Sequence, residues 1–219
     1  MAESHYKSLL YAYKNIPSDA ETLELFQPPN ELAREIDEHI KNHHLAVQLR
    51  NDPNFEESRP HLKILSPFKE QNLMAGTLAG EGMIAVPPLH FAEEGGKSSV
   101  SIFYLGSDIC GHPGIVHGGL LATILDEGLA RCCFPALPKK RALTANLNVN
   151  YRKPAPADNY FVLKANTVKV QGRKAWVEGR IESLTVNGEA PTVYTEASAL
   201  FIEPKDLAVR QSRIVGDHG

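Results

Sequence analysis

The chain has 219 residues, of which 42% are hydrophobic and 22% charged, as expected for one globular domain with an extension. The sequence has no apolar run of about 18 residues and therefore predicts no membrane span. A net charge of −3 argues against a general nucleic-acid binder. The three cysteines lack metal-type spacing, which fits a reducing compartment. The opening MAESHYKSLLYAYKN is not a convincing leader, so we expect a cytoplasmic location and leave a mitochondrial one open.

Charge is unevenly distributed along the chain. Residues 1–138 hold 10 Lys and Arg against 18 Asp and Glu, whereas residues 139–180 hold 10 against 2. This basic block indicates either an anionic small ligand or a solvated basic sheet face, and charge alone does not decide between them.

Residues 1–70 form a predicted N-terminal extension, acidic and interrupted by prolines, with one helix expected over Pro29–Arg50. His39, His43 and His44 have a helical spacing that could bind a metal, but no carboxylate or cysteine partner is evident, and an exposed helix face is the favoured reading. A main domain over 71–205 and a C-terminal tail over 206–219 complete the predicted organisation.

The main domain is predicted to contain one buried helix among antiparallel strands. Strands are expected over 77–91 and 98–106, before an apolar helix over Gly119–Cys133 that ends ahead of Phe134-Pro135. The clearest strand is Ala142–Tyr151, in which apolar residues alternate with a polar face that begins at Thr144 and Asn146. Three further strands are expected over 160–170, 174–184 and 192–202. This order predicts an α+β fold.

Two acids lie in the apolar helix, and only one has an evident partner. Glu127 has Arg131 four residues later, an ordinary helical ion pair. Asp126 has no cation at i±3 or i±4. An unpaired acid in such a helix is costly, so we interpret Asp126 as functional; the alternative is a pairing with a distant group.

The start of the same helix is a candidate anion site. His117-Gly118-Gly119 leaves the first turn without large side chains, and bare backbone N–H groups there can bind an oxyanion. The alternative is that the glycines only permit a tight turn. Together the donors and the acid suggest acyl chemistry, with a carbonyl to polarise and water to activate.

Seven residues separate Gly119 from Asp126, roughly 10 Å along a helix, so both cannot contact one thioester carbon. If two such helices pack antiparallel across a two-fold axis, Gly119 of one subunit lies opposite Asp126 of the other. The sequence therefore predicts a homodimer, or a dimer of dimers, with shared sites.

The segments GIVHGGLLATILDEGLA, ALTANLNVNYRKPAP, VQGRKAWVEGRIES and TEASALFIEP resemble the hotdog-fold acyl-CoA thioesterases, in the branch of the phenylacetate-pathway enzymes and human thioesterase superfamily members. The resemblance covers about residues 75–203. It implies a hotdog fold, in which an antiparallel sheet wraps one long helix, and hydrolysis of acyl-CoA to free acid and coenzyme A. No cofactor or metal is implied, since coenzyme A is part of the substrate.

The resemblance assigns roles residue by residue. Asp126 falls on the catalytic carboxylate, acting as general base or nucleophile, and Gly119 on the polarising N–H, beside Gly118 and His117. Thr144 falls on the hydroxyl that orients water or the acid. The expected substrate-binding positions are Gly118, His112, Asn146, Arg152, Lys153, Arg173 and Lys174, the last four for the coenzyme A phosphates.

The chain departs from the family pattern at one position. Several relatives have asparagine six residues before the histidine of HGG, where this sequence has Gly111 followed by His112, so His112 is a candidate replacement. A non-catalytic acyl-CoA binding module is the alternative function, because fold does not fix function. A hotdog hydratase is weaker, since no convincing second acid-base pair is found.

Overall fold

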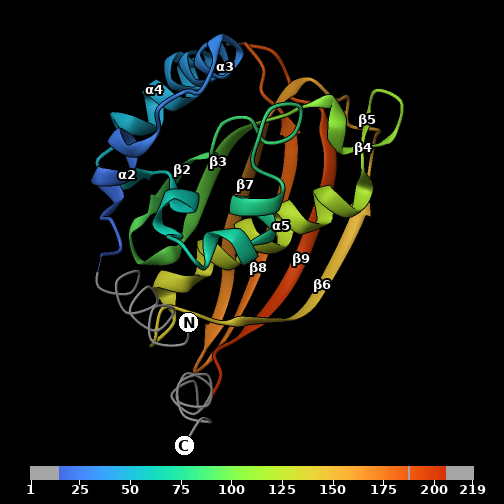
Figure 1. Cartoon of the computed structure of the whole chain (residues 1–219). Coiled ribbons are helices and arrows are strands. Elements are labelled where there is room, and N and C mark those ends of the chain that lie inside the picture. Colours follow the sequence, from blue (N-terminus) through green and yellow to red (C-terminus); the bar gives the residue numbers. More distant parts are fainter. Residues whose placement is uncertain (1–14, 187, 206–219) are drawn as a thin grey trace, which may run out of the picture.

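The computed structural model describes residues 15–186 and 188–205, in which an antiparallel sheet curls around one long helix, α5 (Figure 1). The sheet has seven strands in the order β1-β2-β3-β7-β8-β9-β6. Its strands are β1 Phe55–Ser58, β2 Leu89–Glu93, β3 Ser98–Leu105, β6 Leu143–Tyr151, β7 Asn159–Gln171, β8 Lys174–Ser183 and β9 Val193–Ile202. A small hairpin holds β4 Cys110–His112 and β5 Ile115–Val116, and the α-helices are α2 Asp19–Leu25, α3 Glu31–Asn42, α4 His44–Arg50 and α5 Gly118–Cys133. The predicted α+β hotdog architecture is confirmed.

Helix α5 is buried along most of its length against the inner face of the sheet. Leu125 and Leu129 are fully buried, and the helix ends at Cys133, directly before Phe134-Pro135 as predicted. Close packing depends on Gly128, where an added Cβ would lie 2.6 Å from a Leu163 methyl carbon of β7. The apolar pattern over 119–133 therefore reflects a helix enclosed by the sheet.

Two sequence predictions are wrong. The segment Thr77–Phe91 is a strand only from Leu89 onward, because Gly80 and Gly82 adopt positive φ angles of 151° and 74° and turn the chain. The helix over Pro29–Arg50 is two helices, since His43 has an extended backbone (φ −61°, ψ 139°) and caps α4. Apolar periodicity continues across both breaks, so it did not reveal them.

The N-terminal helices cover the outer face of one part of the sheet. In Figure 1, α2, α3 and α4 lie on the side of β2 and β3 that faces away from α5. Ile36 and Ile40 of α3 are buried with Phe91 and Ile102 in a second apolar cluster. The segment before residue 71 also supplies β1, which pairs with β2, so the sheet includes residues of the predicted extension.

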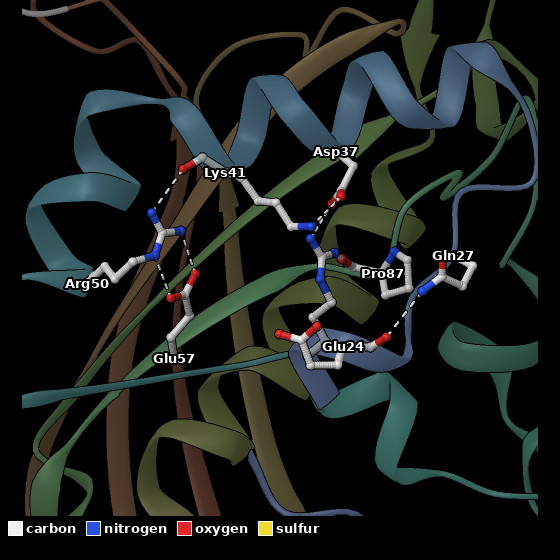
Figure 2. A network of polar contacts seen from close by, with 8 residues as sticks. Glu24, Gln27, Asp37, Lys41, Arg50, Glu57 and Pro87 are labelled. Atoms are coloured by element: carbon white, nitrogen blue, oxygen red, sulfur yellow. Dashed lines mark hydrogen bonds and ion pairs between the residues drawn. The ribbon is translucent and has the colours of Figure 1, made fainter. Parts of the chain in front are cut away.

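A buried ion network fixes these helices. Arg59 is fully buried, and its guanidinium bonds to the Asp37 carboxylate of α3 and to the Pro87 carbonyl. Figure 2 shows Asp37 with Lys41, whose ammonium lies 2.7 Å from the same carboxylate. A second pair in Figure 2 joins Arg50 to Glu57 at 2.6 Å. Charges bound this way hold α3 and α4 to the β1 region.

None of the helices within residues 15–186 and 188–205 is long and apolar enough to cross a membrane.

We expect Asp37→Ala to lower the free energy of unfolding by about 3–5 kcal/mol, because it leaves the Arg59 charge buried without its anion. Lys41→Ala is the matched control; its ammonium is partly exposed and should contribute roughly 1 kcal/mol or less. Urea denaturation measures both. Equal losses would contradict the assignment of Arg59 and Asp37 as the central pair.

Candidate functional site

The candidate acid has a hydroxyl partner. Asp126 is half-buried on α5, and the Thr144 hydroxyl of β6 donates a hydrogen bond of 2.8 Å to its carboxylate. The structure therefore brings together the two residues that the sequence placed 18 positions apart. Thr144 holds the carboxylate toward the exposed edge strand of the sheet.

The route by which Thr144 reaches Asp126 differs from the prediction. Alternation assigned Thr144 to the polar face of its strand, but Ala145 is an extra residue in β6, between the pairs Thr144–Phe201 and Asn146–Leu200. This bulge changes the phase of the strand and turns Thr144 inward, to the face of buried Phe201. Asn146 stays on the outer face, away from α5 in the same chain.

The first turn of α5 is partly capped rather than bare. The Gly119 N–H donates a 3.0 Å hydrogen bond to Nδ1 of His117, the N-cap residue. The Tyr151 hydroxyl donates a 2.8 Å bond to the Gly118 carbonyl, a contact that sequence reasoning missed. In the sequence, this hydrogen bond was indicated only by an aromatic residue with a hydroxyl group at the end of the apolar face of β6. Two side-chain hydrogen bonds thus join α5 to β6, near Gly118 and at Asp126.

A groove of about 320 Å³ lies beside this turn. Its lining residues are Leu78, Ile109, Cys110, His117, Leu120 and Thr123. Gly111 lies against the same histidine, because a Cβ there would come within 3.1 Å of the His117 ring. In this conformation a larger residue at 111 would crowd His117. His112 is exposed on β4.

The predicted basic residues lie at opposite ends of the sheet. The backbone N–H groups of Arg152 and Lys153 bond to the Tyr194 carbonyl at the start of β9. Lys174 pairs with Ile202 at the end of β9, and Arg173 donates to the Glu203 carbonyl at 2.6 Å. The seven residue steps along β9 from Thr195 to Ile202 extend for roughly 24 Å. The two pairs therefore cannot bind the same phosphate within one chain.

A second polar cluster lies on the other side of α5. The predicted pair of Glu127 and Arg131 is confirmed at 2.9 Å, and His61 Nε2 also lies 2.6 Å from the Glu127 carboxylate. Burial raises the pKa of Glu127, but the His61 hydrogen bond and the Arg131 charge outweigh it and lower the pKa to about 2. His61, on the loop after β1, thereby links the N-terminal region to α5, and this link had no signal in the sequence.

A small, mostly apolar cavity of about 40 Å³ lies beside this cluster. His90 borders it, buried on β2, with Nδ1 2.8 Å from the Ser101 hydroxyl of β3. Burial, aided by the nearby Arg131 charge, lowers the pKa of His90 to about 3, so the folded protein holds this imidazole neutral.

Within residues 15–186 and 188–205, no three His, Cys, Asp or Glu side chains are grouped to hold a metal ion. Of the three extension histidines, His43 caps α4 and its Nε2 lies 3.0 Å from the Thr185 carbonyl. His39 stacks on Tyr160 at 4.1 Å. Their spacing thus serves ring packing and capping. Cys132 and Cys133 are buried in the core.

A long helix enclosed by a curled antiparallel sheet defines the hotdog fold, and because fold does not fix function, the class of thioester hydrolases is identified from sequence relatives. The family model described as the thioesterase superfamily matches residues 113–188, which include α5, β6, β7 and β8.

Curated proteins also match the chain, and one of them is named as a thioesterase. An uncharacterized protein of Schizosaccharomyces pombe is 37% identical over 71% of this chain and 90% of its own length. An uncharacterized mitochondrial protein of Candida albicans is 33% identical over 77% of this chain and 76% of its length. The acyl-coenzyme A thioesterase THEM4 of Mus musculus is 42% identical over 49% of this chain, and the match covers 44% of that enzyme's length. The chain belongs to the thioesterase superfamily. The expected cytoplasmic location finds no support among these relatives.

We expect the stability of the protein to fall as the pH is lowered from about 6.5 to about 3. In this range the unfolded chain binds a proton on His90 and the folded chain does not, which favours unfolding by about 2–3 kcal/mol over two pH units. His90→Asn should flatten this dependence, because the variant has no imidazole at this position to bind a proton on unfolding. Chemical denaturation at a series of pH values measures the slope; identical slopes in wild type and His90→Asn would contradict the neutral buried histidine.

Proposed function

We propose that the protein is an acyl-CoA thioesterase that hydrolyses the thioester of acyl-CoA to a free acid and coenzyme A. The observation that carries the proposal is the 2.8 Å hydrogen bond from Thr144 to Asp126, which orients a carboxylate on the central helix. The name of the mouse relative supports the same substrate class. The acyl group stays unassigned.

Asp126 is the proposed catalytic carboxylate, as general base or as nucleophile. As a base it takes a proton from water while the water oxygen bonds to the carbonyl carbon. The carbon–sulfur bond then breaks, and the proton passes to the leaving thiolate. Thr144 fixes the position of the carboxylate by occupying one of its oxygens, which leaves the other to face water.

The Gly119 N–H is the proposed donor to the thioester carbonyl oxygen, at the positive end of the α5 dipole. This donor is held by His117 Nδ1 at 3.0 Å, so the imidazole has to rotate away when the carbonyl binds. The groove of Leu78, Ile109 and Leu120 beside His117 offers an apolar wall for the substrate.

The active sites are proposed to be shared in a homodimer. Strand β6 is an edge of the sheet with a free row of backbone groups, and its Leu143 and Tyr151 are 60% and 54% exposed. Antiparallel pairing of β6 with its copy places the Thr144 end of one strand beside the Tyr151 end of the other. Because Thr144 bonds to Asp126 and Tyr151 to Gly118, each Asp126 would then face the partner subunit's first turn of α5.

The same pairing reunites the separated basic residues. Arg152 and Lys153 follow the Tyr151 end of β6, whereas Arg173 and Lys174 lie two strands from the Leu143 end, about 10 Å across the sheet. In an antiparallel dimer one pair from each subunit borders the same site. We propose that these cations bind the coenzyme A phosphates.

We also propose a mitochondrial location for the protein, which the name of the Candida relative supports.

Free thiol release from acetyl-, octanoyl- and palmitoyl-CoA tests the proposed function. Asp126→Asn should lose at least about 100-fold in turnover, because amide cannot act as base or nucleophile. Thr144→Val should lose roughly 10-fold, and Thr144→Ser, which keeps the hydroxyl, should stay close to wild type. Circular dichroism and gel filtration verify that the variants keep fold and assembly. Full turnover by Asp126→Asn would remove this carboxylate from the mechanism.

A further inference from the structure

One end of the sheet carries an exposed patch of apolar side chains on its outer face. Strand pairing places Lys169, Trp176, Leu200 and Asn146 in one row across β7, β8, β9 and β6, and Gln171, Lys174, Ile202 and Leu143 in the next. We call the apolar members of these rows, together with the neighbouring Val168, the sheet-end patch: Leu143, Val168, Trp176, Leu200 and Ile202. Figure 1 shows this end of β8 and β9 far from α3 and α4, so those helices do not cover it.

Every apolar side chain of the patch is at least partly exposed. Leu143 and Val168 are 60% and 55% exposed, and Trp176, Leu200 and Ile202 are half-buried beside them. The rows further along the same face are polar, with Asn166, Glu178 and Ser198. Grouped apolar side chains of this kind on a soluble surface mark a contact site.

Cations surround the patch. Lys140 and Arg141 precede β6, and Lys169 lies in the first of the two rows, all three of them exposed. Among the described residues no carboxylate forms an ion pair with any of these three, whereas nearby Glu203 is buried and accepts a hydrogen bond from the Lys139 N–H. The Lys169 ammonium lies 4.9 Å above the Trp176 ring, an aromatic residue of the kind that favours the headgroup region of a bilayer.

We propose that the sheet-end patch docks the protein on an anionic lipid surface, an interaction beyond the proposed hydrolysis. A small anion would leave the apolar side chains in water, and a second copy docked face to face would oppose cations with cations. A bilayer with acidic headgroups suits both the cations and the apolar side chains of the patch. The cations remain among the lipid phosphates, and the apolar side chains enter the bilayer interface. The attraction comes from only a few surface cations, so binding should be weak, reversible and sensitive to salt.

Docking at this end has a consequence for the candidate site. Leu143 directly precedes Thr144 at the start of β6, so the hydrogen bond between Thr144 and Asp126 would lie near the headgroups. An amphiphilic thioester that partitions into the bilayer would then meet the enzyme where its carboxylate lies.

Co-sedimentation of the full chain with vesicles tests this proposal. We expect binding to phosphatidylcholine vesicles that contain phosphatidylserine, little binding to phosphatidylcholine alone, and release at high salt. Lys140→Glu with Lys169→Glu should lower vesicle binding at least 10-fold while thiol release from acetyl-CoA in solution is unchanged. The matched control is Lys69→Glu with Lys153→Glu, the same charge change away from the patch, scored for vesicle binding only.

Three results would overturn the proposal. Equal binding by the patch variant and the control variant would show that net charge, not this surface, attracts the vesicles. Unchanged binding by Val168→Ser, with the salt dependence intact, would mean that the patch binds phosphates without entering the interface. Complete displacement of the protein from vesicles by free coenzyme A would assign the patch to the nucleotide of the substrate. Loss of binding in Val168→Ser and resistance to coenzyme A support lipid docking.

Discussion

The hydrogen bond between Thr144 and Asp126 depends on one extra residue in an edge strand. Without Ala145 as a bulge, the alternation of β6 would turn the Thr144 hydroxyl to the outer face, and the acid of α5 would lose its partner. The rest of β6 keeps its apolar side chains on the core, where Leu147 and Val149 pack. The bulge thus lets one strand serve both the core and the candidate site.

The position of α5 is fixed from both sides. Toward β6, the hydroxyls of Tyr151 and Thr144 bond to the helix near its start and at Asp126. On the other side, Glu127 is held by Arg131 and by His61 from the N-terminal region. Adjacent acids therefore have separate functions, because a turn of about 100° per residue directs them to different surroundings. Glu127 is a structural anchor, and Asp126 faces the edge where a second subunit is proposed to bind.

The sequence predicted the helix, the four strands that follow it and the residues of the candidate site, because apolar periodicity is strong in buried segments. It missed features that depend on contacts between distant segments. The bulge at Ala145 leaves no mark on alternation, and the bond between His61 and Glu127 joins residues 66 positions apart. The basic block looked continuous because Arg152 and Arg173 are close in sequence, yet the antiparallel strands carry them to opposite ends of the sheet. The capping of Gly119 by His117 depends on a side-chain rotamer that the sequence does not encode directly.

In the proposed homodimer, each active site combines the Asp126 carboxylate of one subunit with the Gly119 N–H of the other. Mixed dimers of Asp126→Asn and Gly119→Pro chains test it most directly, since proline removes the N–H in a helical turn that tolerates it. Each variant alone should be nearly inactive. Co-refolded in equal amounts, half of the dimers are mixed and each has one intact site, so about a quarter of wild-type thiol release should return. No recovery in mixed dimers, with dimer exchange verified, would place both groups within one chain and contradict the shared site.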